Sequence, residues 1–228
     1  MTTDEKLVAQ LVDDQLSKWI RQKDDEHDRL NGWSVITFSK EPGSRGNEIA
    51  RDVAGRLNFA LFDRDLIKGI AQSVQISEKV IENLEKDRLS GIEDFIASLI
   101  QKHYLHPDLY MEHLMKLIAV IGKQGRTVIV GRGANFLLPP GESFNVRVIA
   151  SLEVRIANVA QAYDVSAEEA KRRVLQRESR RQAFIRQAFH ADVKDPKHYD
   201  LIVNTSKVTV PAAVRAICGA WEGQAGKG

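Results

Sequence analysis

The architecture is set by Trp33-Ser-Val-Ile-Thr-Phe38, the following Ser39-Lys-Glu-Pro-Gly-Ser-Arg-Gly46 and, further on, Phe59-Ala-Leu-Phe62. The first and last of these segments are short apolar runs, which are typical of buried strands. Between them, from Asn47 onward, apolar residues recur on one face of a helix. A strand, a glycine-bearing turn, a helix and a second strand in this order predict the βαβ unit of a parallel sheet.

Three further strands are predicted downstream, and helices separate them. The apolar runs that predict these strands are 127–130, 146–150 and 200–204. The run 127–130 is short and β-branched throughout, as expected of a strand buried on both faces. Five parallel strands with helices on both faces define a three-layer α/β fold, in which ligands bind beyond the carboxyl ends of the strands.

The helical segments extend this picture. Residues 65–123 show helical spacing and no strand pattern, which predicts a helical insertion between two strands of the sheet. A helix is expected over 152–163, and the capping box Ser166-Ala-Glu-Glu169 opens a longer one. Pro211 fits the first turn of a last helix, where its missing N–H has no consequence.

The first 31 residues are set apart from the rest. Residues 4–30 carry apolar side chains three and four apart, and Asn31-Gly32 is a helix stop. We therefore divide the chain into an amphipathic helix over 1–31 and a domain over 32–228. The apolar face either packs on its own domain or forms a homodimer contact, and the sequence leaves both interpretations open.

Composition narrows the class of protein. The 228 residues include 33 Lys and Arg against 31 Asp and Glu, so the formal net charge is only +2. Such a balance gives no global attraction to nucleic acid or to an anionic membrane, and any basic site is local. The single cysteine, Cys218, excludes an intrachain disulfide. With no signal peptide and no apolar run near the ~20 residues that span a bilayer, we expect a cytoplasmic protein.

The glycine turn after the first strand is a candidate anion site. A glycine loop that opens a helix presents main-chain N–H groups and the positive helix end to a phosphate, with Arg45 or Lys40 supplying further charge. The alternative is a tight turn that uses glycine for its geometry alone. The residues predicted to hold the donor phosphates are Gly43, Ser44, Arg45, Gly46, Asn47 and Glu48.

A second candidate follows the third strand. Gly131-Arg132-Gly133 places an arginine at the carboxyl end of that strand, where a guanidinium can hold a phosphate or carboxylate. The flanking glycines let a ligand come near the backbone. A surface salt bridge is the competing interpretation for Arg132.

The long helix supplies the third candidate. Between residues 167 and 189 there are seven basic and three acidic residues, and Arg173, Arg177, Arg180 and Arg181 share one helical face. The functional interpretation is a lid that brings arginines onto a transferring phosphoryl group, and the alternative is a solvated helix face. RNA binding is disfavoured because no aromatic residues alternate with the arginines to stack bases.

Two weaker signals remain. Asp63-Arg64-Asp65 follows the second strand and either contacts substrate or caps the next helix. His103, His106 and His113 do not have the compact spacing of a metal-ligand set, and no metal site is predicted.

Four motifs together resemble the cytidylate kinase-like family, within the P-loop nucleoside monophosphate kinases. They are Ile36–Ala50, Leu61–Ile67, Val130–Asn135 and Tyr199–Thr205, and the resemblance covers about residues 33–217. It implies a five-stranded core, a nucleotide-acceptor insertion over 65–123 and a lid over 165–195. It also implies transfer of the γ-phosphoryl of ATP, with Mg²⁺, to a nucleoside monophosphate such as CMP or dCMP.

The resemblance assigns roles to single residues. Arg132 matches the arginine that holds the acceptor phosphate, and Asp63 matches the aspartate at the end of the second strand. Arg177 and Arg180 match successive lid arginines, and with Arg181 they are the predicted catalytic residues.

The chain also departs from the family pattern. Asn47 replaces the phosphate-loop lysine, and Ile49 stands where a hydroxyl would hold Mg²⁺. Gly133 and Arg181 replace two expected aspartates, and Phe184 replaces a later lid arginine unless Arg186 takes that place. Loss of one preorganised donor costs on the order of 100–1000-fold in rate. A kinase fold that binds a nucleotide or phosphorylated ligand with weak or no turnover is therefore the second functional hypothesis.

Overall fold

The structure, a computed structural model, describes residues 34–63, 67, 109–139 and 141–225. The predicted N-terminal helix and its dimer contact lie outside the described residues, as does most of the predicted insertion over 65–123. The C-terminal part of this insertion is helical as predicted, in α6 (Leu109–Gln124). Among the helices of the described part, none is both long and apolar enough to cross a membrane.

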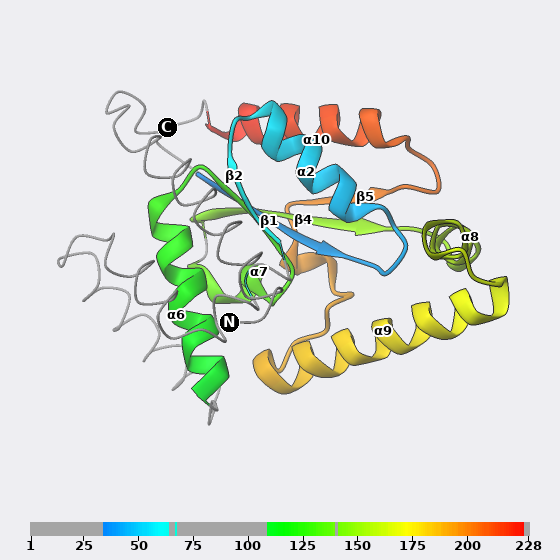
Figure 1. Ribbon diagram of the computed structural model, residues 1–228. Helices are drawn as coiled ribbons and strands as arrows, with labels where there is room; N and C mark the ends of the chain where they lie inside the picture. The colour runs from blue at the N-terminus through cyan, green and yellow to red at the C-terminus, as the bar shows by residue number, and fades with distance from the viewer. Residues whose placement is uncertain (1–33, 64–66, 68–108, 140, 226–228) are drawn as a thin grey trace, which may run out of the picture.

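A parallel sheet of five strands forms the centre of the domain (Figure 1). Its spatial order is β2-β3-β1-β4-β5, so the first strand of the sequence lies in the middle. The neighbours of β1 align with it from Val35, which is opposite Thr127 on one side and Ser143 on the other. The strands are β1 (Val35–Lys40), β2 (Ala60–Phe62), β3 (Thr127–Val130), β4 (Ser143–Ile149) and β5 (Leu201–Asn204).

Helices cover both faces of the sheet and complete three layers (Figure 1). On one face lie α2 and α10, on the other lie α6, α7 and α9, and α8 follows the carboxyl end of β4. The bounds of the elements not yet given are α2 (Gly46–Arg56), α7 (Ala134–Leu137), α8 (Leu152–Tyr163), α9 (Ala167–Phe189), a short 3₁₀ helix (Pro196–His198) and α10 (Val210–Ala225).

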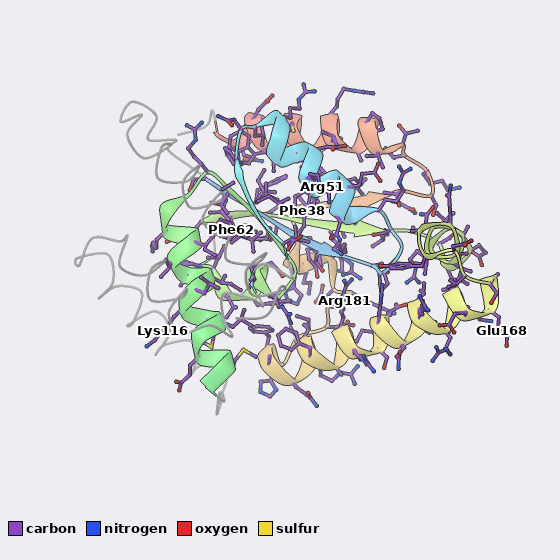
Figure 2. The ribbon with its side chains drawn as sticks, viewed as in Figure 1. Phe38, Arg51, Phe62, Lys116, Glu168 and Arg181 are labelled. Carbon is purple, nitrogen blue, oxygen red and sulfur yellow. The ribbon has the colours of Figure 1, made fainter. Side chains whose placement is uncertain are left out.

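The two faces of the sheet bury two separate apolar cores. Successive strand residues point to opposite faces, so Val128 and Val130 pack with α2 and α10, whereas Ile129 packs with α6 and the end of α9. All four residues of β3 are buried, as predicted for a strand covered on both sides. Phe38 and Phe62 lie in this interior, whereas Lys116 and Glu168 point outward (Figure 2).

Most predicted elements are confirmed, but the bounds of several strands differ from the prediction. The strand over 127–130 and the helix over 152–163 form as expected, and the strand predicted over 200–204 spans Leu201–Asn204. The strand predicted over 33–38 spans Val35–Lys40, and β4 begins at Ser143 rather than at residue 146. Two of its first three residues, Ser143 and Asn145, are polar, and in the register with β1 the Thr37 hydroxyl donates to Asn145 Oδ1 at 2.6 Å. A buried polar pair of this kind hides a strand from a search for apolar runs.

The capping box is confirmed in one half. The Ser166 hydroxyl accepts the main-chain N–H of Glu169 at 3.2 Å, as an N-cap does. The Glu169 carboxylate binds Arg172 and Arg173 on the next turn. These two guanidinium groups hold the pKa of Glu169 at about 2.

Candidate functional site

A cavity of about 440 Å³ opens at the carboxyl ends of β1 and β3, under the middle of α9. This is the end of a parallel sheet where ligands of such folds bind. Two carboxylates, Glu41 and Glu178, line it together with an excess of cations. The cationic side chains that line it are Lys40, Arg132, Arg147, Arg177, Arg180 and Arg181.

The loop after β3 brings Arg132 to the cavity in an unusual conformation. Gly131, Arg132 and Gly133 all have positive φ, at 81°, 56° and 71°, and the Gly131 N–H donates to the carbonyl of Phe38 on β1. A left-handed conformation at a residue other than glycine is disfavoured and is common at functional sites. Gly133 has a second reason to be glycine, because a Cβ there would stand 2.3 Å from the Phe189 ring. The expected aspartate therefore has no space at this position.

Two buried polar atoms in this wall of the cavity have no hydrogen-bond partner among the described residues. They are Arg132 Nε and Asn135 Nδ2, and both residues line the cavity. Buried N–H groups are nearly always paired, so a pair of such orphans beside a cavity points to a ligand that accepts their hydrogen bonds. Asn135 was not among the predicted site residues, although it closes one of the motifs quoted above.

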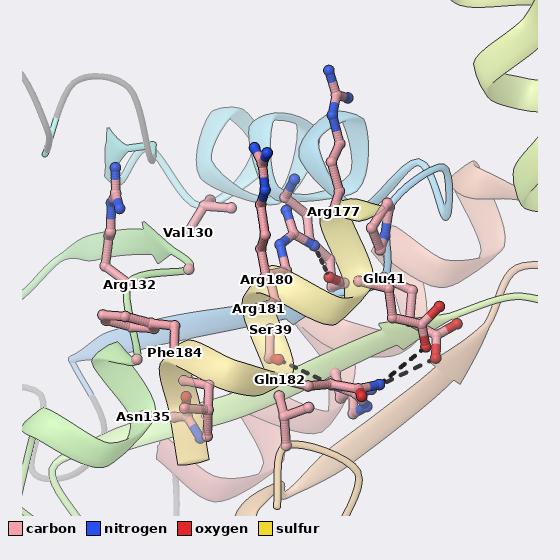
Figure 3. Close-up of a pocket in the computed structure, with 18 residues that line it drawn as sticks. Ser39, Glu41, Val130, Arg132, Asn135, Arg177, Arg180, Arg181, Gln182 and Phe184 are labelled. Carbon is pink, nitrogen blue, oxygen red and sulfur yellow. Dashed lines mark hydrogen bonds and ion pairs between the residues drawn. The ribbon is translucent and has the colours of Figure 1, made fainter. Parts of the chain in front are cut away.

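The helix α9 supplies the opposite wall. Arg181 extends from α9 toward the sheet (Figure 2) and donates from Nη1 to the main-chain carbonyl of Lys40. Arg177 lies with its guanidinium 5.3 Å from the centre of the Tyr163 ring. Arg132, Arg177 and Arg180 extend in the same direction (Figure 3), and within the described part of the chain none of the three forms an ion pair.

The two carboxylates of the cavity are already neutralised. Glu41 lies between two buried arginines, 3.6 Å from Arg147 and 3.5 Å from Arg155, and also accepts the main-chain N–H of Ala150. Glu178 binds Arg155 at 2.9 Å and Lys194 at 3.7 Å. Burial by itself raises the pKa of Glu178, but Arg155 and Lys194 outweigh it and the pKa is lowered. Both carboxylates are paired with basic side chains, which leaves the cavity cationic.

Sequence reasoning missed this network. Its one available signal was Arg147, a charge inside an otherwise apolar strand that had to find a buried partner. Arg155, Glu41 and Glu178 lie in three different segments, and only the fold brings them together.

The predicted phosphate turn lies beside the cavity, and Gly43 to Glu48 do not line it. Gly43 packs on α8, where a Cβ would be 2.4 Å from the Arg155 carbonyl oxygen, and its own carbonyl accepts from Asn158 at 2.8 Å. Ser44 is fully buried, and its hydroxyl donates a hydrogen bond to the main-chain carbonyl of Glu41. Arg45 is held by Glu48 through two hydrogen bonds, which raises the pKa of the guanidinium.

The main-chain N–H groups of this turn are available to bind an anion. Within the described residues, those of Arg45, Gly46 and Asn47 donate to no protein acceptor, and they stand at the N-terminus of the 11-residue helix α2. Asn47 is exposed there.

Asp63 lies apart from the cavity. Its main-chain carbonyl accepts from Ile67 at 3.0 Å, as at the start of a helix, and Arg64 lies outside the described residues. The substrate contacts expected of both residues stay predictions.

The described residues do not form a magnesium cage. Within these ranges no three His, Cys, Asp or Glu side chains gather as metal ligands, and Glu41 and Glu178 are both engaged by arginine. Mg²⁺ binds through few protein ligands and several phosphate or water oxygens.

The sheet order and a cationic cavity at the strand ends define an α/β protein of the kinase-fold class. A family model described as the cytidylate kinase-like family matches residues 35–207. The chain is 34% identical over 183 residues to a cytidylate kinase of Pyrobaculum arsenaticum, covering 79% of this chain and 89% of that one. It is 27% identical over 187 residues to one of Pyrococcus abyssi, covering 82% and 92%.

A solved structure agrees with the fold. The crystal structure of an uncharacterized protein from Eubacterium ventriosum superposes with a TM-score of 0.65 at 18% identity, covering 83% of this chain and 98% of that chain. The chain belongs to the cytidylate kinase-like family, which confirms the predicted family and fold class. Family and relatives support a nucleotide kinase.

Proposed function

We propose that this protein transfers the γ-phosphoryl group of ATP to a nucleoside monophosphate, with CMP or dCMP as the favoured acceptor. The observation that carries the proposal is the convergence of Arg132 with Arg177 and Arg180 on one cavity, from segments more than forty positions apart in the sequence. Cytidylate kinases among the relatives favour cytosine as the acceptor base.

The cavity suits a reaction that consists mainly of positioning and charge stabilisation. In the proposed step an oxygen of the acceptor 5′-phosphate forms a bond to the γ-phosphorus. The bond from that phosphorus to the β–γ bridging oxygen breaks, and ADP leaves. Arg132 and Asn135 would hold the acceptor phosphate, and Arg177 and Arg180 would stabilise the charge on the transferring group.

Arg181 has a different position from the other predicted catalytic residues. Its bond to the carbonyl of Lys40 joins α9 to the loop after β1, so we assign it to closure of the cavity. The main-chain amides of residues 45–47 would hold the donor phosphates, and Mg²⁺ would arrive with ATP.

One observation favours the second hypothesis, a nucleotide-binding protein with little turnover. Asn47 at the lysine position is uncharged, and Arg45 beside it is held by Glu48. A coupled assay for ADP formation with each nucleoside monophosphate, at high enzyme concentration, separates the two. Turnover with CMP or dCMP supports the kinase. Thermal stabilisation by ATP or CMP without product in any assay indicates the binding protein. Absence of both turnover and stabilisation contradicts both hypotheses.

A further inference from the structure

We infer that Lys40 supplies the cation that the phosphate turn has lost, and is a catalytic residue contacting the donor phosphates. The inference rests on the proposed function, since it names a residue of the same reaction. Lys40 is the last residue of β1 and lines the cavity. It stands seven positions before Asn47, on the opposite side of the turn.

The path of the Lys40 side chain is the first argument. A Cβ placed on Gly46 would lie 2.6 Å from Lys40 Cβ and 3.0 Å from Lys40 Cδ. The lysine stem therefore lies against the first residue of α2. Two bonds separate Cδ from the ammonium group, so the stem runs beside the N-terminus of α2, where the amides of residues 45–47 have no protein acceptor within the described residues.

The presence of glycine at position 46 is the second argument. Gly46 does not have a positive φ, so its backbone conformation does not require glycine. What requires it is space, because any side chain there would collide with the stem of Lys40 and with Val148. The turn is thus built around the close passage of this lysine.

The groups around Lys40 point the same way. Arg45 is bound to Glu48 by two hydrogen bonds and does not line the cavity. Arg181 donates to the main-chain carbonyl of Lys40, which brings α9 onto the same residue. Glu41, the nearest carboxylate in sequence, is held by Arg147 and Arg155 and so does not neutralise an incoming phosphate.

A replacement that keeps the stem and removes the charge tests the role. We expect Lys40→Met to lower kcat with ATP and CMP on the order of 100–1000-fold, as loss of a preorganised cation does, and to leave the affinity for CMP within about threefold. The control is Lys123→Met. Lys123 lies on α6, pairs with Glu142 and does not line the cavity. It should keep kcat. A kcat of Lys40→Met equal to that of the wild type overturns the assignment, and so does a loss of CMP affinity as large as the loss of kcat.

A second measurement uses the unaltered protein and does not depend on the variant folding. Amine acetylation is followed by mass spectrometry with and without ATP. We expect ATP to slow acetylation of Lys40 at least tenfold and to leave Lys123 unchanged. Equal labelling of Lys40 with and without ATP contradicts the inference even when the protein turns over. Absence of turnover and of any ligand response instead contradicts the proposed function itself.

Discussion

The turns after β1 and β3 leave neighbouring strands at the same edge of the sheet, yet they differ in what they offer to a ligand. In the turn at 43–48, Gly43 packs against the backbone of Arg155 on α8, and Arg45 is bound to Glu48. The turn at 131–133 faces the cavity and leaves Arg132 Nε without a partner in the described residues.

The cationic charge of the site therefore lies mainly outside the first turn. The first turn offers main-chain amides and a passage for Lys40, whereas the second turn and α9 offer guanidinium groups. The loss of a lysine from the first turn therefore does not leave the cavity uncharged. The cationic charge lies instead on residues at the rim of the cavity.

The largest effect is expected at the second turn. Arg132→Met should reduce kcat/KM for CMP on the order of 100–1000-fold, because a half-buried guanidinium proposed to hold the acceptor phosphate is lost. Steady-state kinetics with varied CMP measures this. Arg172→Met is the matched control, since Arg172 is exposed on α9 and bound to Glu169. If Arg132→Met and Arg172→Met had equal kcat/KM, the acceptor phosphate would not bind at Arg132.

The next effect is a contrast in stability between the two turns. Gly43→Ala should destabilise by about 3 kcal/mol, because a left-handed φ of 84° is combined with a clash against the Arg155 backbone. Gly131→Ala has a similar φ of 81° but open space around it, and should cost only about 1 kcal/mol. Urea unfolding of both variants compares them. Equal losses would mean that the first turn is no more tightly packed than the second.

A smaller effect is expected at the ion pairs behind the first turn. Glu178→Gln should destabilise by about 1–2 kcal/mol at pH 7, since Arg155 keeps Glu41 as a partner. Because the pKa of Glu178 is lowered in the folded state, its contribution is complete above the usual carboxyl value of 4.5 and is lost as the pH falls through the lower value.

Unfolding at several pH values measures that dependence. The difference between wild type and Glu178→Gln should be constant from pH 7 to about 5 and shrink below the usual carboxyl pKa. A difference that grows on acidification would have the wrong sign for this ion pair.

The smallest effect lies at the start of α9. Ser166→Ala should cost about 1 kcal/mol through loss of the N-cap hydrogen bond, with kcat unchanged because Ser166 is far along the helix from Arg177. Thermal unfolding and the kinase assay measure the two responses. A fall in kcat would show that the arginines depend on the whole helix rather than on its middle.

The fold was predictable from the sequence because its signals are local. Apolar strands such as 127–130 and the Ser166 cap are each decided within a few residues. β4 was misplaced at its start because Asn145 is satisfied by Thr37, more than one hundred positions away in the sequence. Arg132 and the α9 arginines were predictable because each follows a strand or shares a helical face.

The rest of the site depends on distant contacts. No spacing rule places Glu41 between Arg147 and Arg155, and none shows that Gly46 makes room for Lys40. The orphaned amide of Asn135 is visible only once the cavity has formed. Residues whose roles depend on contacts between segments far apart in sequence are the ones that single-sequence reasoning missed.

The most direct test is a crystal structure of the full chain with a bisubstrate analogue in which adenosine and cytidine are joined by five phosphates. Our account predicts the polyphosphate in the cavity, with Arg132 and Arg180 within hydrogen-bond distance of its oxygens and the adenosine-side phosphates at the amides of residues 45–47. A polyphosphate bound elsewhere, or one that neither guanidinium contacts, would contradict it.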